Sequence, residues 1–137
     1  MEALKTIEFK VTVGVNTEMV KNILIGAFEG GSNYWYHALE VDHWPDGMSR
    51  SDFKCWWAEV PLHKGGVLRF RDLEDPYVPS ADEDDFYHLS IDNIKSGMAA
   101  MKAMHPRHWN DFITEGDDAI TADVFLQCCV FGDVIYG

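Results

Sequence analysis

The stretch Glu29 to His37, EGGSNYWYH, sets the boundary between two elements of the fold, because two glycines and two small polar residues directly precede three aromatic residues and a histidine. Glycine accepts the left-handed backbone that closes a helix, so the helix before this stretch is expected to end at Gly30 or Gly31. The aromatic residues that follow suit either a buried strand or a surface that stacks on a ligand. The residues of the stretch leave both interpretations open.

The residues before this stretch predict a strand and then a helix. Apolar and polar side chains alternate from Ile7 to Val13, which is the period of a half-buried strand. Asn16 and Thr17 are suitable N-caps for the helix that follows. The apolar residues on one face of this helix are Met19, Val20, Ile23, Leu24, Ala27 and Phe28.

Downstream, the aromatic residues begin a second strand, on which Tyr34 and Tyr36 share one face while Trp35 and His37 share the other. Residues with strand character recur in four segments, at residues 33–42, 53–60, 67–72 and 87–91.

The last third of the chain predicts helices. One is capped by Asp92 and ends before Pro106, a short one follows Pro106, and a mostly buried one runs from Ala119 to Phe131. The short helix presents Trp109, Phe112 and Ile113. Beyond the last helix, the side chains expected to be packed are Val134, Ile135 and Tyr136.

This order of elements, without regular alternation of strand and helix, predicts an α+β fold. We expect a small antiparallel sheet with helices packed on one face and a helical C-terminal third. A length of 137 residues suits a single domain, residues 1–137. The proline-bearing acidic segment DLEDPYVPSADEDD, residues 72–85, is expected to be an exposed loop.

Composition limits the class of protein. No apolar run is long enough to span a membrane, and the first residues lack the pattern of a secretory signal. Three cysteines without framework spacing suit a reducing compartment. We therefore expect a cytoplasmic protein without a membrane contact.

The net charge of −12 is concentrated in the second half of the chain. Residues 72–137 carry fourteen acidic side chains against three basic ones, which accounts for −11. Such a surface repels a phosphate backbone, so no direct binding to nucleic acid is expected. It suits a protein partner with a basic surface.

The candidate groups for catalysis or metal binding lack the patterns that these chemistries need. His105 and His108 flank a proline without a third ligand, and the adjacent pair Cys128 and Cys129 diverges on a helix. The sequence contains neither a nucleophile elbow nor a phosphate loop. Cys55 beside two tryptophans is more readily a packed thiol than a reactive one. We expect a non-enzymatic protein without a metal or cofactor.

Two sequence elements resemble a group of small accessory proteins of tailed phages and prophages. The first is Gly30-Gly31-Ser32-Asn33-Tyr34-Trp35 after an amphipathic helix, which matches a GGxxYW element. The second is the ending from Ala122 to Gly137, which matches an ADxxxQxxxFGxxxYG tail. Residues 43–90 lie outside the match. The resemblance implies a phage accessory protein that acts in the cytoplasm of a bacterial host.

Several functions therefore stay open. One is a counter-defence inhibitor of the anti-CRISPR-like or nucleic-acid-mimic kind, which binds a basic surface of a host defence protein through its acidic half. The second is a sponge that sequesters a nucleotide immune signal, for which Lys64, Arg69 or Arg71 would supply positive charge. The third is a virion or assembly accessory protein. The chain is also a possible homo-oligomer. The residues expected to bind a ligand or partner are Asn33, Tyr34, Tyr36, His37, Trp44, Asp75, Asp82, Glu83, Asp84 and Asp85.

Overall fold

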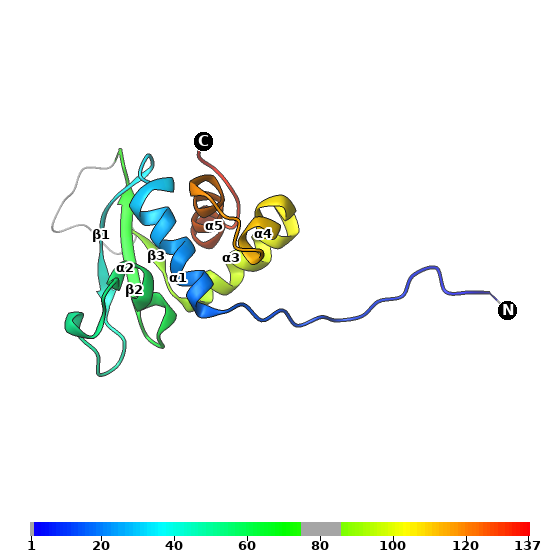
Figure 1. The fold of residues 1–137 in the computed structure, drawn as a ribbon, viewed down its shortest axis with the longest axis horizontal. Helices are drawn as coiled ribbons and strands as arrows, with labels where there is room; N and C mark the ends of the chain where they lie inside the picture. The colour runs from blue at the N-terminus through cyan, green and yellow to red at the C-terminus, as the bar shows by residue number, and fades with distance from the viewer. Residues whose placement is uncertain (1, 75–85) are drawn as a thin grey trace.

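A computed structural model describes residues 2–74 and 86–137 of the chain (Figure 1). The elements in chain order are α1 (Thr17–Gly26), the π-helix η1 (Ala27–Gly31), β1 (Tyr36–His43), the 3₁₀-helix η2 (Arg50–Asp52), α2 (Trp56–Glu59), the 3₁₀-helix η3 (Val60–Leu62), β2 (Val67–Asp72), β3 (Tyr87–Leu89), α3 (Ile91–Met104), α4 (Pro106–Ile113) and α5 (Ala119–Phe131).

The strands form one antiparallel sheet in the order β1-β2-β3, and α1, α3, α4 and α5 cover one face of it (Figure 1). The α+β fold, the antiparallel sheet and the helical C-terminal region are therefore confirmed. Within the described ranges, no helix is long and apolar enough to cross a membrane. Of the segment expected to be an exposed acidic loop, Asp72 ends β2, and residues 75–85 lie outside the described residues.

The strand predicted over residues 7–13 is wrong. These residues belong to an arm that extends away from the sheet, beyond α3 and α4 (Figure 1). Ile7 is 82% exposed and Phe9 is 81% exposed, so the alternation does not describe a half-buried strand of this domain. A strand forms only where a neighbouring edge pairs with its backbone, and the described residues give the arm no such edge.

The first helix begins as predicted but does not end as predicted. Asn16 caps α1 by accepting a hydrogen bond from the Glu18 backbone N–H at 2.8 Å. The chain then continues into η1, and neither Gly30 nor Gly31 has a positive φ. Gly31 is needed for a different reason. A Cβ at this position would lie 2.3 Å from the carbonyl oxygen of Ala119, where α5 begins.

A β-bulge in β1 changes which side chains face the helices. Ala38 has a φ of 57°, and the register shifts between the pairs His37↔Arg71 and Glu40↔Arg69. Consequently Tyr36 and Leu39 both pack against the core, although simple alternation places them on opposite faces.

The strand predicted over residues 53–60 is also wrong, because this segment is helical. The Glu59 side chain accepts a hydrogen bond from the Cys55 backbone N–H at 2.8 Å, which closes the single turn of α2. The turn buries Ala58 and Val60 and leaves both tryptophans half-buried. The aromatic content of the segment therefore reflects packing at the edge of the domain.

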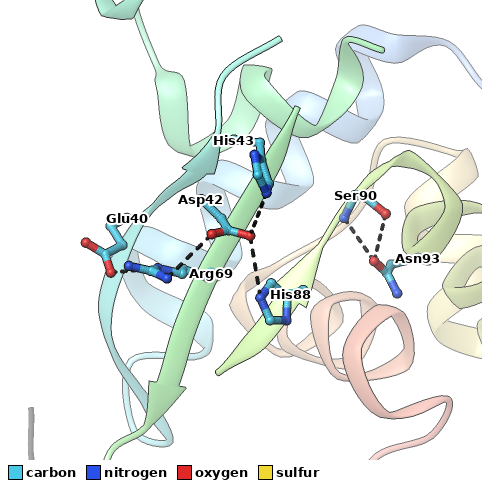
Figure 2. A network of polar contacts seen from close by, with 7 residues as sticks. All are labelled: Glu40, Asp42, His43, Arg69, His88, Ser90 and Asn93. Atoms are coloured by element: carbon cyan, nitrogen blue, oxygen red, sulfur yellow. Dashed lines mark hydrogen bonds and ion pairs between the residues drawn. The ribbon is translucent and has the colours of Figure 1, made fainter. Parts of the chain in front are cut away.

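The C-terminal third of the chain follows the prediction with two corrections. Ser90 rather than Asp92 caps α3, since the Ser90 backbone and hydroxyl both donate to Asn93 Oδ1 (Figure 2). Ile135, beyond α5, is 59% exposed, so it is not packed as expected. As predicted, α5 is buried around most of its circumference.

Candidate functional site

The turn at residues 30–35 and the C-terminal segment, residues 122–137, meet at the side chain of Asp123 on α5. Asp123 Oδ1 accepts hydrogen bonds from Ser32 Oγ and Trp35 Nε1, both at 2.8 Å. Asp123 Oδ2 accepts from the Tyr34 hydroxyl at 2.5 Å and from Gln127 Nε2 at 2.9 Å. One carboxylate thereby ties the turn after η1 to α5.

Gln127, one helical turn further along α5, attaches the C-terminal tail. Its Oε1 accepts from the backbone N–H groups of Ile135 and Tyr136, both at 2.9 Å. The Tyr136 ring stacks on Trp35 with 5.4 Å between the ring centroids, and its hydroxyl donates to Asp72. We call Ser32, Tyr34, Trp35, Asp123, Gln127 and Tyr136 the motif network.

A groove of about 490 Å³ borders the motif network, with Gly31, Tyr34 and Ile120 in its lining. The polar groups of the network that reach it already have partners inside the protein. Burial, together with the hydrogen bond and the charge of Asp123, raises the pKa of Tyr34 to about 12, so this phenol stays protonated. The motif network therefore holds the fold together and offers few free polar groups to a ligand.

The structure disperses the residues that the sequence predicted for binding. Asn33 is exposed at the turn, and Tyr36 points into the core, where its hydroxyl donates to the Phe28 carbonyl. Trp44 is 37% exposed and stacks on Phe53. His37 lies on the opposite face of the sheet from the helices, whereas the acidic candidates Asp75, Asp82, Glu83, Asp84 and Asp85 lie outside the described residues.

The face of the sheet that the large helices leave uncovered carries a cluster of charged side chains. We call it the outer sheet face, formed by His37, Glu40, Asp42, Arg69, Arg71 and His88. At its centre, Arg69 donates to Glu40 Oε1 at 2.8 Å and lies 3.5 Å from Asp42 Oδ1 (Figure 2). Asp42 Oδ2 lies 3.5 Å from His43 Nε2 and 3.6 Å from His88 Nε2.

Within the outer sheet face, Arg71 and His37 are paired in the strand register, and each has side-chain nitrogens without a hydrogen-bond partner among the described residues. Arg71 is only 6% exposed, yet its Nε and Nη1 have no partner among the residues that the structure describes. The same holds for the buried Nε2 of His37. Directly opposed residues of an antiparallel pair project to the same face, so these three buried nitrogens are neighbours on the outer sheet face.

Phe86 supports both arginines of this face. Its ring centroid lies 4.3 Å from Arg69 Cζ and 5.4 Å from Arg71 Cζ, within the range of a cation–π contact. An aromatic ring holds a guanidinium in place without using its N–H donors. The contact with Phe86 therefore uses none of the Arg71 N–H donors.

The strand period of residues 67–72 correctly placed Arg69 and Arg71 on one side of β2. Glu40, Asp42 and His88 were not among the residues predicted from the sequence. Glu40 and Asp42 nevertheless alternate with apolar residues, as Arg69 and Arg71 do in β2. The partner of each arginine could not be predicted, because the bulge at Ala38 sets the register.

The other groups considered for chemistry have structural roles. Burial raises the pKa of Cys128 to about 11 and that of Cys129 well above its ordinary value, so both stay thiols. His105 bonds to Asp133 at 2.8 Å, whereas His108 bonds to Thr121 at 2.9 Å. Over residues 2–74 and 86–137, no cluster of three or more His, Cys, Asp or Glu residues has the geometry of a metal site.

Comparisons with protein-family models, with curated proteins and with solved structures found no match to this chain.

Proposed function

We propose that this protein is a non-enzymatic phage accessory protein that sequesters a small phosphate-bearing ligand, of the class of nucleotide immune signals, on its outer sheet face. The observation that carries this proposal is that Nε and Nη1 of the buried Arg71, and Nε2 of His37, have no hydrogen-bond partner among the described residues. Both groups are hydrogen-bond donors when the histidine is protonated or carries its proton on Nε2.

A buried cation without a counter-charge costs several kcal/mol, and leaving its N–H donors unpaired adds to that cost. A phosphate oxygen relieves both penalties, because it supplies negative charge and accepts several hydrogen bonds. Arg69 does not compete for this role, since it already contacts Glu40 and Asp42. Arg71 is therefore the cation that an incoming anion would meet.

Arg71 and His37 can donate hydrogen bonds to a ligand, and Arg71 can balance its negative charge. These properties suit the binding of a ligand rather than the cleavage of a bond in it. The phage resemblance supplies the biological context, since a protein that withholds a nucleotide signal would protect a phage from a host defence effector. Binding to the folded state alone would also stabilise the protein.

The test is thermal unfolding of the full chain with inorganic phosphate and with a panel of linear and cyclic nucleotides. We expect the proper ligand to raise the Tm of the natural protein and to leave that of Arg71→Met unchanged. Arg107→Met is the matched control, because Arg107 is exposed on α4 and its loss should not alter the ligand-induced shift. Mass spectrometry of heat-released small molecules would identify a co-purified ligand.

Without ligand, Arg71→Met should be at least as stable as the natural protein, since an apolar side chain of similar length replaces an unpaired buried charge. A large loss of stability in this variant, together with no Tm shift by any anion, would refute the proposal. The alternative source of negative charge for Arg71, in place of a ligand, is the acidic side chains of the chain itself. If neutralising Asp82, Glu83, Asp84 and Asp85 destabilises the protein only while Arg71 is present, the site is an internal ion pair.

A second candidate function, the inhibitor of a basic host protein, is favoured by the connection between α4 and α5. Asp111, Glu115 and Asp117 are exposed there, and none has a salt bridge with a described residue. Surplus negative charge on one side of a protein attracts a basic partner and accelerates association.

Affinity capture from a lysate of the bacterial host at two salt concentrations separates this candidate from the first. An inhibitor should retain a basic protein at low salt and lose it as the salt rises, because exposed charges are screened over about 8–10 Å at physiological ionic strength. Asp111→Asn with Asp117→Asn should weaken that capture without altering any anion-induced Tm shift.

A further inference from the structure

The N-terminal arm, residues 2–14, leaves a row of large apolar side chains exposed to solvent. The row consists of Ile7, Phe9, Val11 and Val13, and each is more than half exposed. The arm projects from the start of α1, and its backbone forms no hydrogen bond with any described part of the chain (Figure 1). A partner strand would pair with the backbone of such a segment and cover its exposed apolar side chains.

The sequence of the arm is complementary to itself when two copies run antiparallel about Phe9. This register places Glu8 of each copy opposite Lys10 of the other and Ile7 opposite Val11. It also places Thr6 opposite Thr12, and the two Phe9 rings meet at the twofold axis. Opposite charges, paired threonines and paired apolar side chains are the cross-strand pairs that stabilise a sheet.

Neighbouring registers lack this complementarity. A twofold axis at Lys10 places the two lysines opposite each other, and an axis at Glu8 does the same with the two glutamates. Parallel pairing in register opposes every charge with its like. Like charges directly opposite destabilise a strand pair, so the arm specifies the register about Phe9.

A cover for the apolar face lies at the root of the arm. Val11, Val13 and Val15 line a groove of about 290 Å³ together with Met98 and Trp109, and with Lys95, Ala99 and Lys102 of α3. In a strand, Ile7, Phe9, Val11 and Val13 project to one face. The arm of a second copy, paired in this register, places its Ile7 beside Val11 and so over this groove. A two-stranded ribbon is marginal alone, and packing against helices is what such a ribbon needs.

We propose that two copies of this chain associate by pairing residues 6–12 of their arms as an antiparallel two-stranded ribbon, with the twofold axis at Phe9. The apolar face of the ribbon packs against the groove at α3 and α4 of each copy. The interface is isologous, as in most homodimers, and each arm contributes the same surface that it receives.

Charge reversal tests the register directly. Glu8→Lys converts two attractive pairs of the dimer into repulsive ones, and Lys10→Glu does the same with opposite sign. We expect each single variant to weaken dimerisation about tenfold at low salt, measured by sedimentation equilibrium of the full chain. The double variant Glu8→Lys with Lys10→Glu restores both attractive pairs, so its dimer should regain the natural affinity. An equimolar mixture of the two single variants should form the heterodimer in preference to either homodimer, detected by native mass spectrometry.

Glu2→Lys is the matched control, because it changes the net charge equally and lies outside the paired residues. It should leave the dimer unchanged. Phe9→Asp removes the central apolar pair and should give a monomer whose Tm equals that of the natural protein at concentrations where the natural protein is monomeric, since the arm lies outside the core. A natural protein that stays monomeric at hundreds of micromolar overturns the proposal, whether the arm is free or folded back on its own chain. A dimer that is insensitive to both single reversals, or a double variant that stays as weak as the singles, overturns it as well.

Discussion

Gly30 and Gly31 are adjacent glycines of η1 that the structure places in opposite steric situations. A Cβ at Gly31 would lie 2.3 Å from the Ala119 carbonyl oxygen and 3.4 Å from the Asp123 backbone nitrogen. A Cβ at Gly30 would meet no atom within 4 Å. Because neither residue has a positive φ, the conformational preference of alanine does not separate them. Gly31→Ala and Gly30→Ala therefore isolate the contact between η1 and α5.

The cost of Gly31→Ala follows from this contact. A methyl group needs about 1 Å more room than the 2.3 Å available, so η1 and α5 must separate. Overpacking of this kind costs about 1–3 kcal/mol, and the separation also strains the hydrogen bonds between Asp123 and the turn after η1. We expect a loss of about 2–4 kcal/mol. Gly30→Ala should be neutral or stabilising by up to about 1 kcal/mol, because it reduces the entropy of the unfolded chain.

Urea unfolding followed by tryptophan fluorescence measures both variants under one set of conditions. The midpoint should fall for Gly31→Ala and stay or rise for Gly30→Ala, with similar m-values. Gly31→Val should be at least as destabilising as Gly31→Ala. Equal stability of the two alanine variants would refute the close approach of η1 to Ala119, and with it the reason given for Gly31.

Three further predictions concern the motif network and its termini. Asp123→Asn should cost about 2–4 kcal/mol in chemical denaturation, because the amide of the new side chain would face donors that now bond to a carboxylate oxygen. Deleting residues 133–137 removes the ring stacked on Trp35 and the two donors to Gln127, so we expect loss of soluble expression or of the cooperative unfolding transition. A hydrogen bond from Tyr136 lowers the pKa of Asp72, and one from His105 lowers the pKa of Asp133. The two carboxylates therefore stabilise the fold above the ordinary carboxyl pKa, about 4, and this stabilisation is lost as the pH falls below it. Tyr136→Phe should make the Tm fall less steeply with decreasing pH in this range.

The local elements of this chain could be predicted where a helix or strand has one face in the core and suitable caps. Asn16 at the start of α1 matches its expected capping role. The period of β2 correctly put Arg69 and Arg71 on one face. These features depend on interactions between residues a few positions apart, so a local sequence pattern is enough to predict them.

The predictions failed where a pattern has more than one physical cause. The alternation of residues 7–13 is that of a strand, but no described residue pairs with its backbone, and its apolar face is left exposed. Trp56 and Trp57 are compatible with a strand as well as with a helical turn. The hydrogen bond from the Cys55 backbone N–H to the Glu59 side chain stabilises the turn. Gly31 suits a helix end, yet its requirement comes from a segment 88 residues away in sequence, at Ala119.

The candidate site shows the same division. The sequence by itself determined which residue types are present, that Arg69 and Arg71 share a face, and that the two segments of the motif network lie far apart in the chain, at residues 30–35 and 122–137. Only the tertiary structure decided that Asp123 joins those two segments and that His37 lies opposite Arg71. The physical reason is that periodicity and capping act over one or two turns of chain, whereas burial and strand register depend on which distant segments share a core. The single-residue bulge at Ala38 is enough to change the partner of each side chain along β1.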